Sequence, residues 1–129
     1  MVGVAKGLSH MHSLNVVHGD ATLKNMLLCR DDIVKVADFG SAHSALGFLL
    51  GQNKEITTRY VMAPERWLGQ SESAPPIDIW AWGVQLYMLH SGQCEWLHTE
   101  NIDEVMPSLA RLIGPIDEES WPGHEQLPK

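Results

Sequence analysis

Residues 77–89 are the most strongly apolar stretch of this sequence, and they limit the possible folds more than any other segment. Large apolar side chains occur on every side of the helix that this stretch predicts: Ile77, Ile79, Trp80, Trp82, Val84, Leu86, Met88 and Leu89. A helix that is apolar all round is buried, so we expect it at the centre of one domain. Asp78 lies near its start, and a buried carboxylate is costly unless several hydrogen-bond donors reach it. The sequence therefore predicts donors around Asp78.

The length and charge of the chain exclude several classes of protein. Its 129 residues are enough for one domain with one core. The formal charge is -7, from 16 acidic and 9 basic residues, and no cluster of Lys or Arg offsets it. An acidic chain without a basic surface is a poor candidate for binding nucleic acid or an anionic membrane, and no apolar run is long enough to span a bilayer. We expect an intracellular protein, in the cytoplasm, the nucleus or both, with Cys29 and Cys94 as free thiols.

The first part of the chain predicts a helix followed by short strands. Apolar residues recur at helical spacing near the start: Val4, Leu8, Met11 and Leu14. Asn15 can close that helix in a left-handed turn. Short apolar segments bounded by polar turns predict brief strands at 16–17, 26–28 and 33–36, with 30–32 as a hairpin connection. Together with the apolar helix, these elements predict a mainly α fold with short β-hairpins, an α+β arrangement.

The second part predicts one long loop and two further helical segments. Residues 41–62 show no clear periodicity and are expected to form a loop, and loops of such length are usually functional or mobile. Residues 64–68 predict a single helical turn. Asn101 and Glu104 indicate a capping box for a last helix that ends near Gly114. Pro107 is unfavourable inside a helix, so a start at Pro107 is the alternative.

Four short motifs stand in one order along the chain, and their residue types suit phosphoryl transfer. They are His18-Gly19-Asp20 with Asn25 shortly after it, Asp38-Phe39-Gly40, Ala63-Pro64-Glu65 and the segment from Asp78 to Gly83. A carboxylate such as Asp20 on a rigid loop can orient a hydroxyl and accept its proton. The amide of Asn25 and the carboxylate of Asp38 supply the oxygen ligands that Mg2+ prefers.

In this order the motifs resemble the C-terminal lobe of the eukaryotic protein kinases, and within them the branch of the cyclin-dependent and MAP kinases (CMGC). The similarity to that branch depends on the tail of the chain: 102–104, 112–115, 121–123 and 127–128. The resemblance covers nearly the whole chain. We therefore expect residues 1–129 to form a partial kinase domain, with the catalytic loop, the activation segment, the buried F helix and the region after it, but without the N-terminal lobe.

The resemblance implies a role for each residue of the catalytic loop. Asp20 would be the catalytic base, and Thr58 would brace Asp20 and the incoming hydroxyl. Lys24 would supply a cation that stabilises the transferring phosphoryl group. Asp78 would accept hydrogen bonds from backbone amides of the catalytic loop. His18 is expected to be structural, with its ring packed against Phe39, because lone histidines near apolar strands are usually satisfied by packing and one hydrogen bond.

The resemblance also implies two cofactor contacts. Asn25 and Asp38 would hold Mg2+ on the phosphates of ATP, and Leu27 would lie beneath the adenine ring. The expected activity is therefore that of an ATP-dependent protein kinase that transfers a γ-phosphoryl group to a hydroxyl of a protein substrate. The branch favours serine or threonine as the acceptor.

The sequence departs from the family pattern at several positions. Gly19 replaces the usual Arg, which in the family binds a phosphate on the activation loop, and the loop carries 53–55 (Asn-Lys-Glu) where the family has its phosphorylated residue. These two differences predict that loop phosphorylation does not activate the protein through residue 19. Thr22 replaces the Lys typical of Ser/Thr kinases, and Lys24 stands where Tyr kinases carry Arg, which leaves the acceptor specificity open.

No Gly-rich loop or Val-Ala-x-Lys strand occurs in the sequence, so a second interpretation belongs beside the enzyme. The chain could be a non-catalytic kinase-like binding or scaffold module, or a truncated relic. We expect negligible ATP turnover from residues 1–129 alone. A cyclin-type partner cannot be inferred, because such partners bind mainly the first lobe in this branch.

Overall fold

The structure is a computed structural model. It describes residues 2–45, 58–69, 74–93, 99, 101–115 and 117–122. None of the helices within these segments is long and apolar enough to cross a membrane. The thiol of Cys29 is free, as predicted, whereas Cys94 and residues 53–55 lie outside the described residues.

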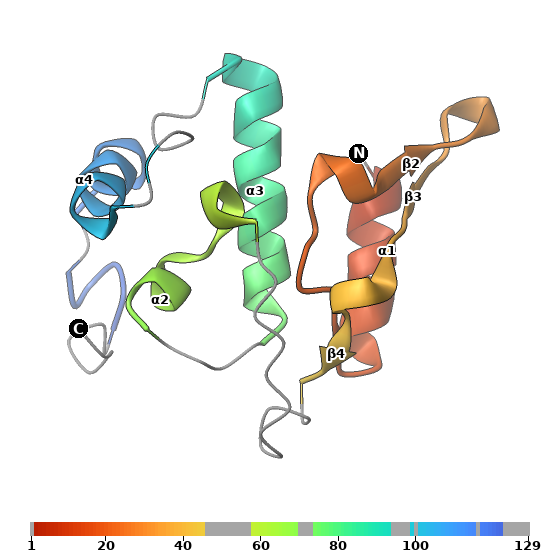
Figure 1. The fold of residues 1–129 in the computed structure, drawn as a ribbon, viewed down its shortest axis with the longest axis horizontal. Coiled ribbons are helices and arrows are strands. Elements are labelled where there is room, and N and C mark those ends of the chain that lie inside the picture. Colours follow the sequence, from red (N-terminus) through yellow and green to blue (C-terminus); the bar gives the residue numbers. More distant parts are fainter. Residues whose placement is uncertain are drawn as a thin grey trace.

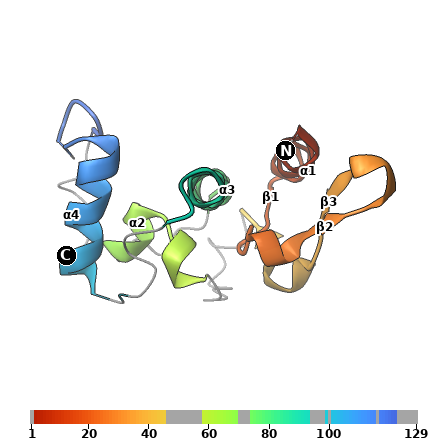
Figure 2. The same cartoon turned by 90° about the horizontal axis from the view of Figure 1, so that it is seen from above.

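One long helix, α3 (Pro76–Ser91), stands in the middle of the molecule. On one side of it lie α1 (Val2–Ser13) and two small sheets, and on the other side lie α2 (Pro64–Trp67) and α4 (Ile102–Ile113) (Figures 1 and 2). The main hydrophobic core joins these helices: Val4, Leu8, Ala21, Val61, Ala81, Trp82, Val84, Val105 and Leu109. The described part of the chain is thus mainly helical with a few short strands, as the sequence predicts.

The central helix α3 is buried on one face only, so the prediction that it is buried all round is wrong. Ile79 and Leu89 are each 54% exposed. With α4, this outer face lines an apolar groove of about 750 Å³. Helical periodicity identifies a surface as apolar, but it does not identify the neighbour that covers it. The buried face carries the side chains that matter for the fold, among them the two polar residues Asp78 and Gln85.

The first helix, α1, packs its apolar stripe into the core, with Val4, Leu8 and Met11 buried. Leu14 is 61% exposed, contrary to the predicted stripe, because the helix ends at Ser13. Asn15 then turns the chain with φ 56°, as predicted. Strand β1 (Val16–Val17) follows and pairs antiparallel with β4 (His43–Ser44), a pairing that the sequence did not predict.

The second sheet is the predicted hairpin. Strand β2 (Met26–Leu28) pairs antiparallel with β3 (Val34–Val36), so Met26 lies opposite Val36. The connection Arg30–Asp32 is the predicted one, and its two aspartates take positive φ. Asp and Asn tolerate that conformation better than other non-glycine residues, which is why this short polar segment can reverse the chain.

The last helix, α4, begins at Ile102, so the alternative start at Pro107 is wrong. The Asn101 side chain accepts a hydrogen bond from the backbone amide of Asp103 at 3.0 Å. The amide of Asn101 donates to the Thr99 hydroxyl rather than to Glu104, so the cap is one-sided. Burial of Val105 and Leu109 holds the helix across Pro107.

The predicted helical turn at 64–68 is α2. Within the predicted loop at 41–62, the described residues form β4 and a 3-10 turn, Arg59–Val61.

Two glycines let α1 lie directly against the hairpin. A methyl group added at Gly3 would lie 2.5 Å from the Val34 carbonyl oxygen, and one at Gly7 would lie 2.8 Å from a Val36 methyl carbon. The first contact is with backbone, which cannot rotate away. The close approach of α1 to β3 therefore requires glycine at position 3.

We predict that Gly3→Ala lowers the melting temperature. Alanine gains roughly 1 kcal/mol of helix propensity over glycine, but the overlap with the Val34 carbonyl costs about 1–3 kcal/mol. Gly83→Ala is the matched control, because a methyl group there meets nothing within 4 Å, and it should raise stability by about 0.5–1 kcal/mol. Thermal unfolding gives the melting temperatures of both variants. A Gly3→Ala protein as stable as the Gly83→Ala protein would disprove the close contact.

Candidate active site

The site is built around the buried carboxylate of Asp78, which is 1% exposed. One carboxylate oxygen, Oδ2, accepts a hydrogen bond from the His18 amide at 2.8 Å and lies 2.8 Å from Nε2 of His12. The other oxygen, Oδ1, accepts from the Gly19 amide at 3.0 Å. The predicted donors around Asp78 are thereby confirmed. This carboxylate ties α1, α3 and the loop after β1 together.

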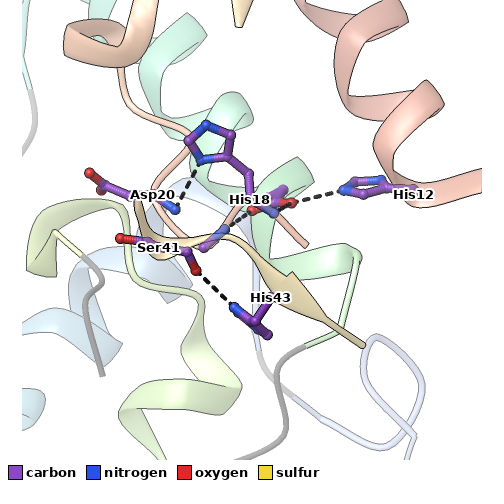
Figure 3. A network of polar contacts seen from close by, with 7 residues as sticks. His12, His18, Asp20, Ser41 and His43 are labelled. Atoms are coloured by element: carbon purple, nitrogen blue, oxygen red, sulfur yellow. Dashed lines mark hydrogen bonds and ion pairs between the residues drawn. The ribbon is translucent and has the colours of Figure 1, made fainter. Parts of the chain in front are cut away.

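The ring of His18 is fully buried and uses both nitrogens for backbone contacts. The Asp20 amide donates to Nδ1 at 3.3 Å (Figure 3). The proton is therefore on Nε2, which donates to the Ala37 carbonyl at 3.0 Å. The ring also packs against Phe39 with centroids 5.7 Å apart, as predicted. His18 is therefore a structural link from the Asp20 loop to the segment that ends in Asp38.

The carboxylate of Asp20 is held by two side chains, one on each oxygen. The Thr58 hydroxyl donates to Oδ1 at 2.8 Å. The Asn25 side-chain amide donates to Oδ2 at 2.9 Å and also to the Asp20 carbonyl at 2.8 Å. The structure thus brings Asp20, Asn25 and Thr58 together, with Asp20 partly exposed. A carboxylate oriented in this way can bind a hydroxyl group and accept its proton.

The chain also brings Asn25 next to the segment that carries Asp38. The Ala37 amide donates to the Asn25 carbonyl at 2.8 Å, one residue before Asp38. Asp38 is exposed, takes φ 59° and accepts from the Gly40 amide at 3.1 Å. Both contacts of the Asn25 side chain use its nitrogen, which leaves Oδ1 for a cation. An amide oxygen and a carboxylate are hard ligands, so this donor set fits Mg2+.

The remaining predicted site residues lie on the exposed side of the same region. Lys24 belongs to the 3-10 turn Leu23–Asn25 and, among the described residues, forms no ion pair. Leu27 is 54% exposed on β2, where a planar ligand could cover it. Thr22 is 1% exposed, so its side chain does not face a substrate.

Two residues with contacts to this region escaped the sequence-based prediction. Nothing in the sequence marks His12 as a partner of Asp78, because the two residues are far apart and helix α1 carries a second histidine, His10. The sequence does contain a signal for Gln85, since it is a polar side chain between apolar residues of the helix. Its Oε1 accepts a hydrogen bond from the Leu23 amide at 3.2 Å.

Gly19 lies where the chain has no room for a side chain. Its φ is +79°, and an added Cβ would lie 2.8 Å from the Ser41 carbonyl oxygen and 3.4 Å from a ring carbon of His43. Figure 3 shows Ser41 and His43 beside the loop, where the Ser41 carbonyl lies 2.9 Å from Nδ1 of His43. The segment after Asp38 therefore packs on the catalytic loop backbone to backbone. Residues 53–55, the other half of the predicted difference, lie outside the described residues.

We predict that Asp78→Asn destabilises the protein by about 2–3 kcal/mol, because an amide can accept from only one side and leaves a backbone donor of residue 18 or 19 facing an NH2 group. Asp103→Asn makes the same chemical change at an exposed position and should cost about 0.5 kcal/mol. Urea unfolding measures both. Equal effects for the two variants would contradict the role of Asp78 as an anchor.

We predict that Gly19→Ala costs more than Gly92→Ala. The two glycines have similar φ values, +79° and +71°, but a methyl group at Gly92 meets nothing within 4 Å. Both variants should lose about 1–2 kcal/mol from the left-handed conformation, and Gly19→Ala about 1–3 kcal/mol more from the overlap with Ser41. Thermal unfolding gives the difference, and equal losses would mean that residue 19 has room for a side chain.

Comparison with known proteins agrees with the motifs and with this geometry. A family model described as Protein kinase domain matches residues 1–129. The chain is 30% identical over 128 residues to cyclin-dependent kinase 15 of Mus musculus, and the aligned region covers 99% of this chain and 30% of that kinase. It is 30% identical over 128 residues to cyclin-dependent kinase 11A of Homo sapiens, covering 99% of this chain and 16% of that protein. For cyclin-dependent kinase 11 of Dictyostelium discoideum the identity is 33% over 122 residues, and the aligned region covers 95% of this chain and 34% of that kinase.

The chain thus spans about a third or less of the length of these curated relatives. The similarity to cyclin-dependent kinases confirms the branch that the tail of the sequence indicates. Because the family model matches the whole chain, and the catalytic-loop residues meet at one site, the chain belongs to the protein kinase family.

Proposed function

We propose that this chain carries the phosphoryl-transfer site of an ATP-dependent protein kinase that phosphorylates serine or threonine in a protein substrate. The observation that carries the proposal is the Asp20 carboxylate, which Thr58 and Asn25 hold from opposite oxygens at a partly exposed position. A side chain that two donors keep in one orientation at the surface is suited to receive a ligand group.

The proposed reaction uses Asp20 to orient the substrate hydroxyl. The hydroxyl oxygen forms a bond to the γ-phosphorus of ATP, the bond from that phosphorus to the bridging oxygen breaks, and ADP leaves. The hydroxyl proton passes to the Asp20 carboxylate. Thr58 keeps Oδ1 of Asp20 in place, so the oxygen geometry is set before the substrate arrives.

Asn25 and Asp38 are the residues that would hold Mg2+ in this proposal, through the amide Oδ1 and the carboxylate. When bound, Mg2+ neutralises charge on the phosphate groups. Lys24 is exposed on the turn that carries Asn25, so its ammonium group is free to approach a phosphoryl oxygen. Leu27 offers the adenine ring an apolar surface.

The choice of serine or threonine depends on the similarity to the cyclin-dependent kinases, since Thr22 is buried and says nothing about the acceptor.

A non-catalytic binding module of the same fold is the competing function. The two differ in one measurable property, the transfer of labelled phosphate from ATP to a protein. The assay uses the full-length protein that carries these residues, with Mg2+, a mixture of peptides that contain serine or threonine, and phosphoamino-acid analysis of the product.

We predict that Asp20→Asn lowers kcat about 10²- to 10³-fold and changes the KM for ATP little, because the amide cannot accept the hydroxyl proton but leaves the nucleotide contacts in place. Asp31→Asn, in the exposed hairpin turn, is the control and should keep full activity. Transfer from γ-labelled ATP measures both. An inactive wild-type protein that still binds ATP or a protein would favour the binding module instead.

A further inference from the structure

The buried face of α3 carries a second polar residue besides Asp78. Asp78 and Gln85 are about two helical turns apart and therefore lie on the same face of the helix. Each is 1% exposed. A buried polar side chain in an apolar helix is costly unless it is hydrogen-bonded. The Nε2 atom of Gln85 has no hydrogen-bond partner in the described part of the chain, so the partner of its Oε1 atom indicates what the residue does.

That partner is the backbone of the catalytic loop. Oε1 of Gln85 accepts a hydrogen bond from the Leu23 amide at 3.2 Å. Leu23 is the first residue of the 3-10 turn Leu23–Asn25, and amides at the start of a helical turn have no partner within it. The residue before the turn, Thr22, does not cap it, since its hydroxyl is buried without a hydrogen-bond partner. Gln85 thus acts as the missing cap, from a distant part of the chain.

The turn that Gln85 caps carries the residues that face the proposed nucleotide. It ends at Asn25, whose side-chain nitrogen donates to both the carbonyl and the carboxylate of Asp20. The Asn25 amide in turn donates to the Thr22 carbonyl at 2.9 Å. A shift of the turn at Leu23 would move Lys24 and Asn25 together, and with them the donor that orients Asp20.

We propose that Gln85 is a positioning residue for phosphoryl transfer, which it supports through the Leu23 amide by fixing the turn that carries Lys24 and Asn25. Helix α3 then holds the catalytic loop at two points, with Asp78 binding the amides of residues 18 and 19 and Gln85 binding the amide of Leu23. The catalytic consequence depends on the proposed kinase function. The geometric consequence, a fixed Asn25 side chain, does not.

The test uses Gln85→Leu, Leu23→Pro and the double variant in the full-length protein. Gln85→Leu removes the acceptor and leaves the Leu23 amide without a partner. Leu23→Pro removes the donor. Proline suits the first position of this 3-10 turn, because Thr22 before it is extended (φ -98°, ψ 161°) and 3-10 turns in general have φ near that of proline. In the double variant donor and acceptor are both absent, so neither is left unpaired. Val84→Ala is the control for loss of packing on the same helix.

The first readout is kinetic. We expect Gln85→Leu to lower kcat about ten-fold, because small displacements of catalytic groups have effects of this order or larger, while the KM for the protein substrate stays within about two-fold. The Mg2+ concentration for half-maximal rate should rise as well. The double variant should recover to within about three-fold of wild type, a recovery that general damage to the core would not give.

The second readout needs no activity. The side-chain amide resonances of Asn25, in protein labelled with 15N asparagine, should move toward those of a solvent-exposed asparagine in Gln85→Leu and return in the double variant. Val84→Ala should leave them in place. If Gln85→Leu matches Val84→Ala in kcat and in these resonances, the inference is wrong while the proposed function stands. If wild-type protein transfers no phosphate but the resonances move and return, the proposed function fails and the positioning role remains. If the protein is inactive and the resonances do not move, both fail.

Discussion

One buried carboxylate holds the site together. Asp78 lies in the apolar interior, where an unpaired charge would be very costly, and its partners are two consecutive backbone amides and the ring of His12. A backbone amide cannot move by side-chain rotation. Because both amides bind one carboxylate, the path of the chain at residues 18 and 19 is fixed. The direction of the next residue, Asp20, follows from that path. The orientation of Asp20 at the surface thus depends on hydrogen bonds to a carboxylate in the core.

The small hairpin supplies the second constraint, because its register brings the segments that carry Asn25 and Asp38 close together. Met26 pairs with Val36, so the residues just outside the ladder, Asn25 and Ala37, meet through a backbone hydrogen bond. Asp38 comes next in the chain. A slip of the register by one residue would turn every side chain of the strand to the other face and would separate Asn25 from Asp38. The strands have only three residues each, but the His18 ring also contacts the Ala37 carbonyl and so ties the end of β3 to the loop that carries Asp20.

The sequence predicted the features that depend on local chemistry. Asn15 in a left-handed turn, the polar hairpin connection and the donors around Asp78 all follow from the residues themselves. It did not predict the pairing of β1 with β4 or the contact of His12 with Asp78, because both join segments far apart in the chain and neither leaves a periodic signal. The exposed face of α3 was predicted wrongly for a related reason. Apolar periodicity reports the character of a face, while its burial depends on a neighbour.

Gly19 shows how one substitution changes what can regulate such a site. With φ at +79° and the Ser41 carbonyl oxygen 2.8 Å from the position of a Cβ atom, the loop and the segment after Asp38 are in backbone contact. An arginine at residue 19 would need both a strained conformation and a wider separation of these segments. In this arrangement residue 19 offers no guanidinium group to a phosphate. The Thr58 hydroxyl, just before the turn Arg59–Val61, instead joins its segment directly to the Asp20 carboxylate through a hydrogen bond that needs no phosphate.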